Sequence, residues 1–223
     1  MNHRIFGAIL TLPILFLVSG CTTQTIRPIS QQVIIEDEEN RSTIIDVKLA
    51  KYTELAKDFP KEARYQEKLA RLHWEKNDHK MSLKALARAK KLDPDNPRYN
   101  YLEAQVFEGI GSYSAAEKAY LAVIEATSSG TEYSGPSMQL GLLYMQMERS
   151  DKAFTCFKNA LEADPTFPEP HYWIGRVQMM HKDRKEAILS FERYIRIGGQ
   201  QRYKEVMKTL QALQPDLRIH DIR

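Results

Sequence analysis

Cysteine is scarce in this sequence, and neither sign of charge dominates it. Only Cys21 and Cys156 occur among the 223 residues, which excludes a disulfide framework unless these two pair with each other. The 32 basic residues are nearly balanced by 29 acidic ones, so the chain as a whole has no large field for nucleic acid or anionic lipid. With 43% hydrophobic residues, it can still bury a sizeable core.

The motifs of an enzyme are also lacking. We find no Ser/His/Asp set, no glycine-rich phosphate loop and no paired carboxylates in apolar surroundings. The histidines beyond the N-terminal segment do not share one helical face at the spacing of metal ligands; they are His73, His79, His171, His181 and His220. The sequence therefore predicts no catalytic residue, metal, cofactor or small-molecule substrate, and a hydrolase or metal-dependent enzyme is the disfavoured alternative.

Residues 1–20 have the organisation of a secretory signal peptide. A short basic start containing Arg4 precedes an apolar stretch from Ile5 to Val18, and the small residues Ser19 and Gly20 follow it. The apolar stretch is short for a transmembrane helix, which needs about 20 residues. We therefore expect export rather than a membrane span.

The residues Val18, Ser19, Gly20 and Cys21 look like a bacterial lipobox. This resemblance implies that Cys21 receives a diacylglyceryl group and becomes the acylated first residue of the mature chain, anchored by several acyl chains. Resemblance to proteobacterial lipoproteins further implies that Thr22, which is not an aspartate, permits export to the outer membrane. We expect the body to face the periplasm, and a surface-facing body is the alternative. An uncleaved anchor with an incidental cysteine is the alternative.

Residues 21–41 show no helical period and include an acidic run from Glu36 to Glu39. We interpret them as a lipidated N-terminus followed by a flexible tether. In the alternative interpretation, the apolar triplet from Val33 to Ile35 docks on the body or on a partner as a short strand.

The stretch 134–167 has the pattern of two antiparallel helices in contact. Gly141 and Ala153 are small enough to let the helix backbones approach, and Tyr144 and Phe157 can fill the space beside them. This arrangement of small and large residues resembles the 34-residue tetratricopeptide (TPR) repeat. A single helix pair cannot bury its own apolar face, so the pattern predicts neighbouring repeats.

The same pattern recurs along the chain. Ile174, Gly175, Ala187 and Phe191 each lie 34 residues beyond Leu140, Gly141, Ala153 and Phe157. Extending this frame gives four repeats, at 63–96, 97–130, 134–167 and 168–201. We expect an N-terminal capping helix within 42–62 and a C-terminal cap helix and tail at 202–223. The predicted fold is therefore all-α, a TPR superhelical solenoid of antiparallel helix pairs.

The TPR resemblance also implies a concave groove lined by the first helix of each repeat, at positions two, five, nine, twelve and thirteen. The aromatic, methionine and arginine side chains found there are favoured by protein-recognition surfaces. The predicted partner-binding residues are Arg71, Trp74, Tyr101, Gln105, Met138, Leu142, Met145, Tyr172, Arg176 and Met179, with Arg64, Glu67 and Met180 at further groove positions. Packing against an adjacent helix is the alternative, above all for Leu142 and Met145.

Two segments resemble the type IV pilus biogenesis lipoproteins called pilotins, which help the secretin ring to reach and assemble in the outer membrane. They are ATSSGTEYSGPSMQLGLLYMQM, at 126–147, and FERYIRIGGQ, at 191–200. The resemblance implies a non-enzymatic adaptor that binds a secretin subunit through its groove. A general envelope scaffold, which positions cell-wall hydrolases or another envelope complex, is the alternative.

Overall fold

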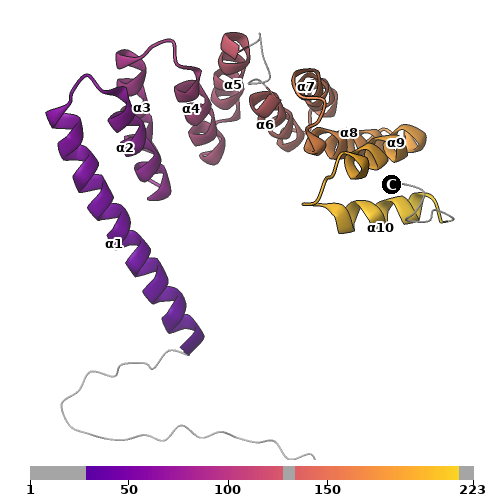
Figure 1. The fold of residues 1–223 in the computed structure, drawn as a ribbon, viewed down its shortest axis with the longest axis horizontal. Coiled ribbons are helices and arrows are strands. Elements are labelled where there is room, and N and C mark those ends of the chain that lie inside the picture. The colour runs from indigo at the N-terminus through magenta and orange to yellow at the C-terminus, as the bar shows by residue number, and fades with distance from the viewer. Residues whose placement is uncertain (1–28, 128–133, 216–223) are drawn as a thin grey trace, which may run out of the picture. The chain divides into compact units, whose positions relative to one another are not determined.

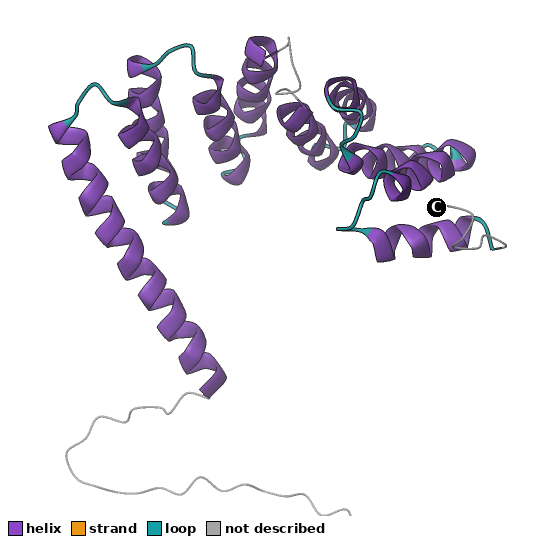
Figure 2. Ribbon diagram, in the orientation of Figure 1, coloured by secondary structure: helices purple, strands orange, loops and turns teal. Residues whose placement is uncertain are grey.

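The structure is a computed structural model that describes residues 29–127 and 134–215. Over these residues the chain forms ten α-helices and no strands, which confirms the predicted all-α solenoid (Figures 1 and 2). The contacts divide the chain into a first unit, 1–41, and a second unit, 42–223. The predicted signal peptide and Cys21 lie outside the described residues. None of the helices within the described part is both long and apolar enough to cross a membrane.

Helix α1, Ile29–Asp58, begins earlier than the sequence predicted. The proposed tether extended to residue 41, whereas the chain is helical from Ile29, and the alternative strand from Val33 to Ile35 is helical as well. The prediction relied on an apolar stripe, but helix formation does not require one. The segment contains no glycine and no proline, so nothing in its local sequence ends a helix.

The second unit contains four consecutive antiparallel helix pairs. Their bounds are α2 Ala63–Glu75 and α3 His79–Leu92, α4 Pro97–Gly109 and α5 Tyr113–Thr127, α6 Ser134–Gln146 and α7 Ser150–Ala163, α8 Pro168–Met180 and α9 Arg184–Arg196. The first helix of each pair begins at the first residue of a predicted repeat. Each pair packs against the next, as expected for a solenoid.

The turn inside each repeat uses a residue with a left-handed backbone. Asn77, Gly111, Glu148 and Lys182 all occupy position fifteen of their repeats and have φ between 58° and 76°. Only one of the four is glycine, although residues with a Cβ adopt this conformation at some cost. The repeat geometry therefore determines the backbone here more strongly than the residue type does.

The core consists of the same repeat positions in all four pairs. At position twenty-four Leu86, Tyr120, Phe157 and Phe191 are at most 1% exposed. At position twenty Ser82, Ala116, Ala153 and Ala187 are equally buried, and the Ser82 hydroxyl is satisfied by donating to the carbonyl of Ala70 at 2.8 Å. The buried large side chain at position twenty-four is the main filler between the helices of each pair.

Glycine at position eight makes room for this filler. The ring of Phe157 occupies the space that a Cβ on Gly141 would need, and Phe191 lies 2.8 Å from the corresponding point on Gly175. From the sequence, small residues at Gly141 and Ala153 were expected to let the two helix backbones approach. In the structure the glycine accommodates an aromatic ring instead, since a flat ring needs the whole face of the helix.

Helix α10, Tyr203–Leu213, covers the C-terminal end of the stack by packing on α9. Val206 and Leu210 are fully buried there. The turn before α10 contains Gly198, at φ 92°, and Gly199, which packs against the ring of Tyr194. The end of the tail, 216–223, lies outside the described residues.

Candidate functional site

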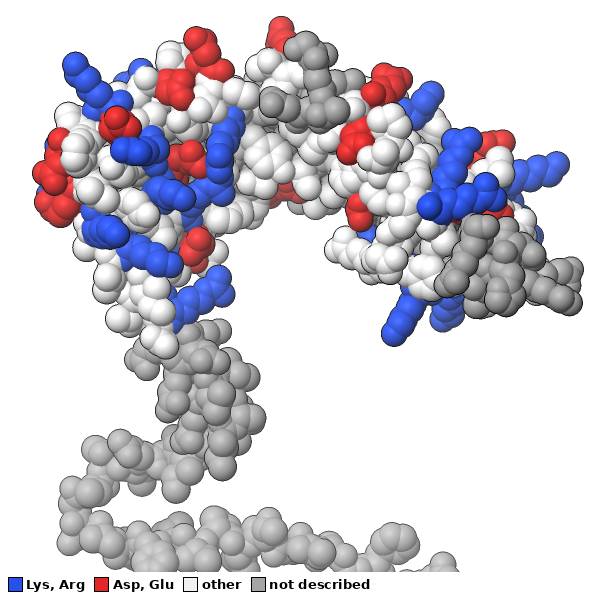
Figure 3. Space-filling model, viewed as in Figure 1, with Lys and Arg blue, Asp and Glu red and all other residues white. Residues whose placement is uncertain are grey.

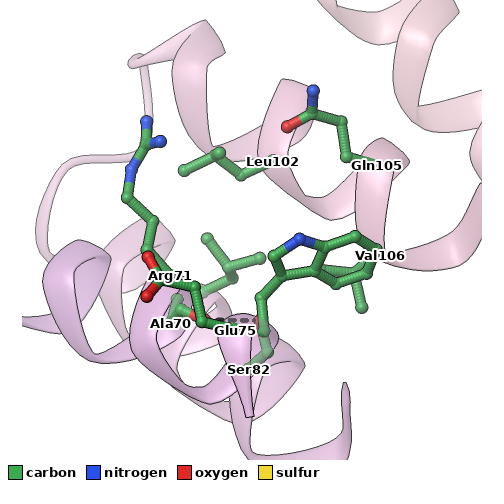
Figure 4. Close-up of a pocket in the computed structure, with 9 residues that line it drawn as sticks. Ala70, Arg71, Glu75, Ser82, Leu102, Gln105 and Val106 are labelled. Carbon is green, nitrogen blue, oxygen red and sulfur yellow. Dashed lines mark hydrogen bonds between the residues drawn. The ribbon is translucent and has the colours of Figure 1, made fainter. Parts of the chain in front are cut away.

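A pocket of about 150 Å³ lies between α2, α3 and α4. Figure 4 shows the side chains from these three helices arranged around it. The lining residues are Ala70, Arg71, Trp74, Glu75, Ser82, Leu86, Leu102, Gln105 and Val106. Its floor is apolar and its edge carries a cation, an anion and an amide, which is the make-up of a site for one side chain of a partner.

Trp74 is held in place by residues of two repeats. Its ring lies against the backbone of Gly109, the last residue of α4, where any Cβ would collide with it. The His79 ring also packs against it, with ring centroids 5.2 Å apart. A half-buried tryptophan fixed in this way presents a preformed aromatic surface, which lowers the entropic cost of binding.

The pocket continues into a wider cleft of about 530 Å³ that reaches α5 and α6. Trp74 and Gln105 line both spaces. The other residues of the cleft are Glu108, Gly109, Tyr113, Tyr120, Gln139 and Gln146. The candidate groove therefore follows the first helices α2, α4 and α6, with Tyr113 and Tyr120 of α5 beside them.

Glu108 is fixed in the cleft by two donors. The hydroxyl of Tyr120 donates to it at 2.9 Å, and the amide of Gln146 donates at 3.3 Å. Burial of Tyr120, together with the charge of Glu108, raises the pKa of this tyrosine, so it remains a neutral donor. By contrast, the amides of Gln105 and Gln139 have no hydrogen-bond partner within the described residues, so they are available to a partner's backbone.

A small ion-pair cluster lies at the N-terminal edge of the pocket. Glu67 lies 3.0 Å from the guanidinium of Arg71 and 3.0 Å from that of Arg98, and it is only 13% exposed. Glu75 also lines this pocket, so two arginines are balanced by two glutamates around it.

The structure brings together only part of the predicted groove. Arg71, Trp74 and Gln105 line one pocket. Tyr101 is half-buried and packs edge-on against Tyr120, with centroids 5.8 Å apart, so it supports the groove from beneath.

Two predicted groove residues are buried. Met138 is 4% exposed and belongs to the central core, next to residues of the preceding repeat. Tyr172 is 1% exposed, because α10 covers it and Glu205 accepts its hydroxyl hydrogen bond at 2.7 Å. Neither side chain is accessible to a partner in this structure, so their assignment to the groove is corrected.

The remaining predicted positions lie apart from the pocket. Leu142 and Met145 are half-buried against the central core, as the alternative for these two residues stated. Arg176 and Met179 are exposed on α8, where Arg176 donates to the hydroxyl of Tyr172 at 2.7 Å. None of these four lines the two spaces around Trp74.

Several polar residues of the cleft were not among the residues predicted from the sequence. Glu108 and Gln146 occupy positions twelve and thirteen of their repeats, which the position rule includes. Neither residue was among the predicted groove residues. Gln139 and Tyr113 lie at positions outside the rule, and no signal in a single repeat would have identified them.

Cys156 is a core residue. It is 7% exposed, and burial raises the pKa of its thiol to about 11, so the reactive thiolate is disfavoured at neutral pH. Within the described residues, no three His, Cys, Asp or Glu side chains are grouped so as to hold a metal ion.

Comparison with known families decides what kind of solenoid this is. Residues 49–97 and 68–131 match a model described as tetratricopeptide repeat, and residues 141–181 match one described as TPR repeat. The chain is a TPR repeat protein. TPR repeats are typically non-catalytic scaffolds that bind protein partners. No curated protein matches this TPR chain in sequence.

Solved TPR structures share the fold at low sequence identity. MamA is 20% identical over 77% of this chain and 96% of its own, with a TM-score of 0.62. PilF from Pseudomonas aeruginosa is 18% identical over 84% of this chain and 90% of its own, also at 0.62. YrrB, described as a TPR protein with an unusual peptide-binding site, is 16% identical over 77% and 94%, at 0.55. These likenesses establish the fold alone.

Proposed function

We propose that this TPR protein is a non-enzymatic adaptor, anchored to the outer membrane through Cys21, whose groove holds a segment of a secretin subunit during type IV pilus assembly. The observation that carries the binding role is the preformed pocket at Trp74, which opens into a wider cleft. The pilotin-like segments and the lipobox support the secretin and the anchor. The fold shared with PilF is consistent with this role.

The groove suits an extended segment with one apolar anchor residue. The pocket is large enough for one apolar side chain beside Trp74, and buried aromatic contacts of this kind often dominate binding energy. The free amides of Gln105 and Gln139 can bond to the segment's backbone along the cleft. Hydrogen bonds from these amides to the backbone of the segment do not depend on its side chains. The pocket, by contrast, selects which side chain can serve as the anchor.

Deletion of the gene in its own bacterium is expected to abolish heat-stable secretin multimers in the outer membrane. The measurement is an immunoblot of unheated membrane fractions, with the wild-type gene restored on a plasmid as the reference. Unchanged multimers in the deletion strain would show that the proposed function is wrong. If crosslinking then captured cell-wall hydrolases and no secretin, the general envelope scaffold would replace it.

Two groove variants and one control refine this test. Trp74→Ala removes the anchor surface, and Gln105→Ala removes an amide that no described residue engages, so the fold does not depend on it. Both are expected to restore fewer multimers than wild type. Leu121→Ala changes a side chain that is 46% exposed on α5 and lines neither space, so it should restore multimers fully.

Cys21→Ser is expected to leave the protein unlipidated and to remove it from the outer-membrane fraction without changing its melting temperature. Serine cannot form the thioether through which the diacylglyceryl group is attached. Incorporation of labelled palmitate and membrane fractionation measure the effect. Cys156→Ala is the matched control, because it removes the other cysteine, and it should keep both label and location. Outer-membrane recovery of Cys21→Ser would refute the anchor.

A further inference from the structure

Four cations form a stripe along the exposed face of α3. Lys80, Lys84, Arg88 and Lys91 are spaced at i, i+4, i+8 and i+11, which places them within a narrow arc of the helix. All four are exposed, and none has an ionic partner within the described residues. The helix contains no acidic residue, and its remaining lysine, Lys90, is paired with Glu103 at 2.8 Å.

The fold does not require these charges. The same four repeat positions hold Ser114, Lys118, Ala122 and Glu125 in α5, and Asp151, Thr155, Asn159 and Glu162 in α7. In α9 they hold Lys185, Leu189, Arg193 and Arg196, so the run is broken by a leucine, and its last arginine lies 3.8 Å from Glu192. An unbroken, unpaired stripe occurs in α3, although the net charge of the whole chain is only +3.

Exposed apolar side chains lie at both ends of this stripe. Met81 is 37% exposed near the start of α3, and Leu92 is 39% exposed at its end. A helix that combines a basic face with exposed apolar residues is the kind that lies on a membrane surface, with cations at the lipid phosphates and apolar side chains among the headgroups. Figure 3 shows basic side chains over this N-terminal part of the stack, with acidic side chains among them.

We infer that this face of α3 docks on an anionic phospholipid surface. The four residues of the stripe line none of the three pockets described in the structure, so the surface offers no recess for the side chains of a specific peptide. The first repeat is also the one nearest in sequence to the proposed anchor. The expectation that the first repeat lies near the membrane rests on the proposed lipidation of Cys21. Docking would hold the first repeat at the membrane while the groove remains open to a partner.

Vesicle binding tests the inference without the anchor. The chain from residue 22 onward keeps every described residue and lacks the acyl group, so a failure here would count against the surface and not against lipidation. It is expected to sediment with phosphatidylcholine vesicles that contain phosphatidylglycerol, but not with phosphatidylcholine alone. The partition coefficient should fall as salt is raised, because each cation near the surface contributes by a screened interaction.

Matched charge variants locate the binding surface. The triple variant Lys80→Gln, Lys84→Gln, Lys91→Gln is expected to lower the partition coefficient at least about tenfold. The control triple Lys185→Gln, Lys204→Gln, Lys208→Gln removes the same charge from exposed positions on α9 and α10, and it should lower binding less than about twofold. Equal losses in both triples would overturn the assignment to α3. Absence of vesicle binding by the parent chain, as expected if the stripe serves an acidic protein, would overturn the inference itself.

Discussion

Gly141→Leu is expected to lower the free energy of unfolding by at least about 1–3 kcal/mol, the usual cost of overpacking a tight core. The Phe157 ring already occupies the space of a Cβ at this position, and it is fully buried. It cannot turn away, because α6 and α7 enclose it and the following repeat packs Trp173 near it, with ring centroids 6.2 Å apart. The leucine must therefore push α6 away from α7. Chemical denaturation measures the loss.

Two further variants test whether the loss of stability in Gly141→Leu comes from the contact between Gly141 and Phe157. Gly135→Ala lies in the first turn of the same helix with nothing within 4 Å of its added Cβ, so it should leave stability unchanged or slightly higher. Phe157→Ala alone should cost about 3–5 kcal/mol. Adding Gly141→Leu to that background should cost less than it does in wild type, because the leucine then enters the vacated space. An unchanged melting temperature for Gly141→Leu would contradict the repeat frame.

The repeat frame could be predicted because its signal lies within each helix pair. Leu86, Tyr120, Phe157 and Phe191 share one position and one environment, so the 34-residue repeat locates all four once the three extra residues at 131–133 are allowed for. Glycine opposite the two phenylalanines adds a second, independent signal. Because the same contact is present in every repeat, the other repeats still reveal the pattern where one residue departs from it, as Ser82 does at the position that alanine occupies elsewhere.

The groove could be predicted only in part because accessibility depends on neighbouring repeats. Position five is half-buried at Tyr101 but buried at Met138 and Tyr172. Met138 is covered by core residues of the preceding repeat, and Tyr172 by the terminal helix that supplies Glu205. A rule written for one repeat contains no information about the helices that pack on either side of it. For the same reason, the unpaired charges of α3 could not be separated from paired ones before the contacts were known.

Leu210→Asp is expected to detach α10 and destabilise the last repeat by at least about 3–5 kcal/mol, since it places an unpaired charge in a fully buried site. Detachment would also break the hydrogen bond between Glu205 and Tyr172. It would also remove the guanidinium of Arg202, which lies 4.7 Å from the centre of the Tyr172 ring. Hydrogen exchange should show lost protection in α8 to α10.

The loss of hydrogen-exchange protection in Leu210→Asp is expected to stay local, because each repeat of a solenoid contacts only its neighbours. Amides of α2 to α4 should therefore keep their protection, since their core around Leu86 shares no residue with the C-terminal cluster. Ala212→Asp introduces the same charge at an exposed position of α10 and should change protection nowhere. Protection lost evenly along the chain would show that the stack unfolds as one unit. Terminal capping would then stabilise the distant groove as well as the last repeat.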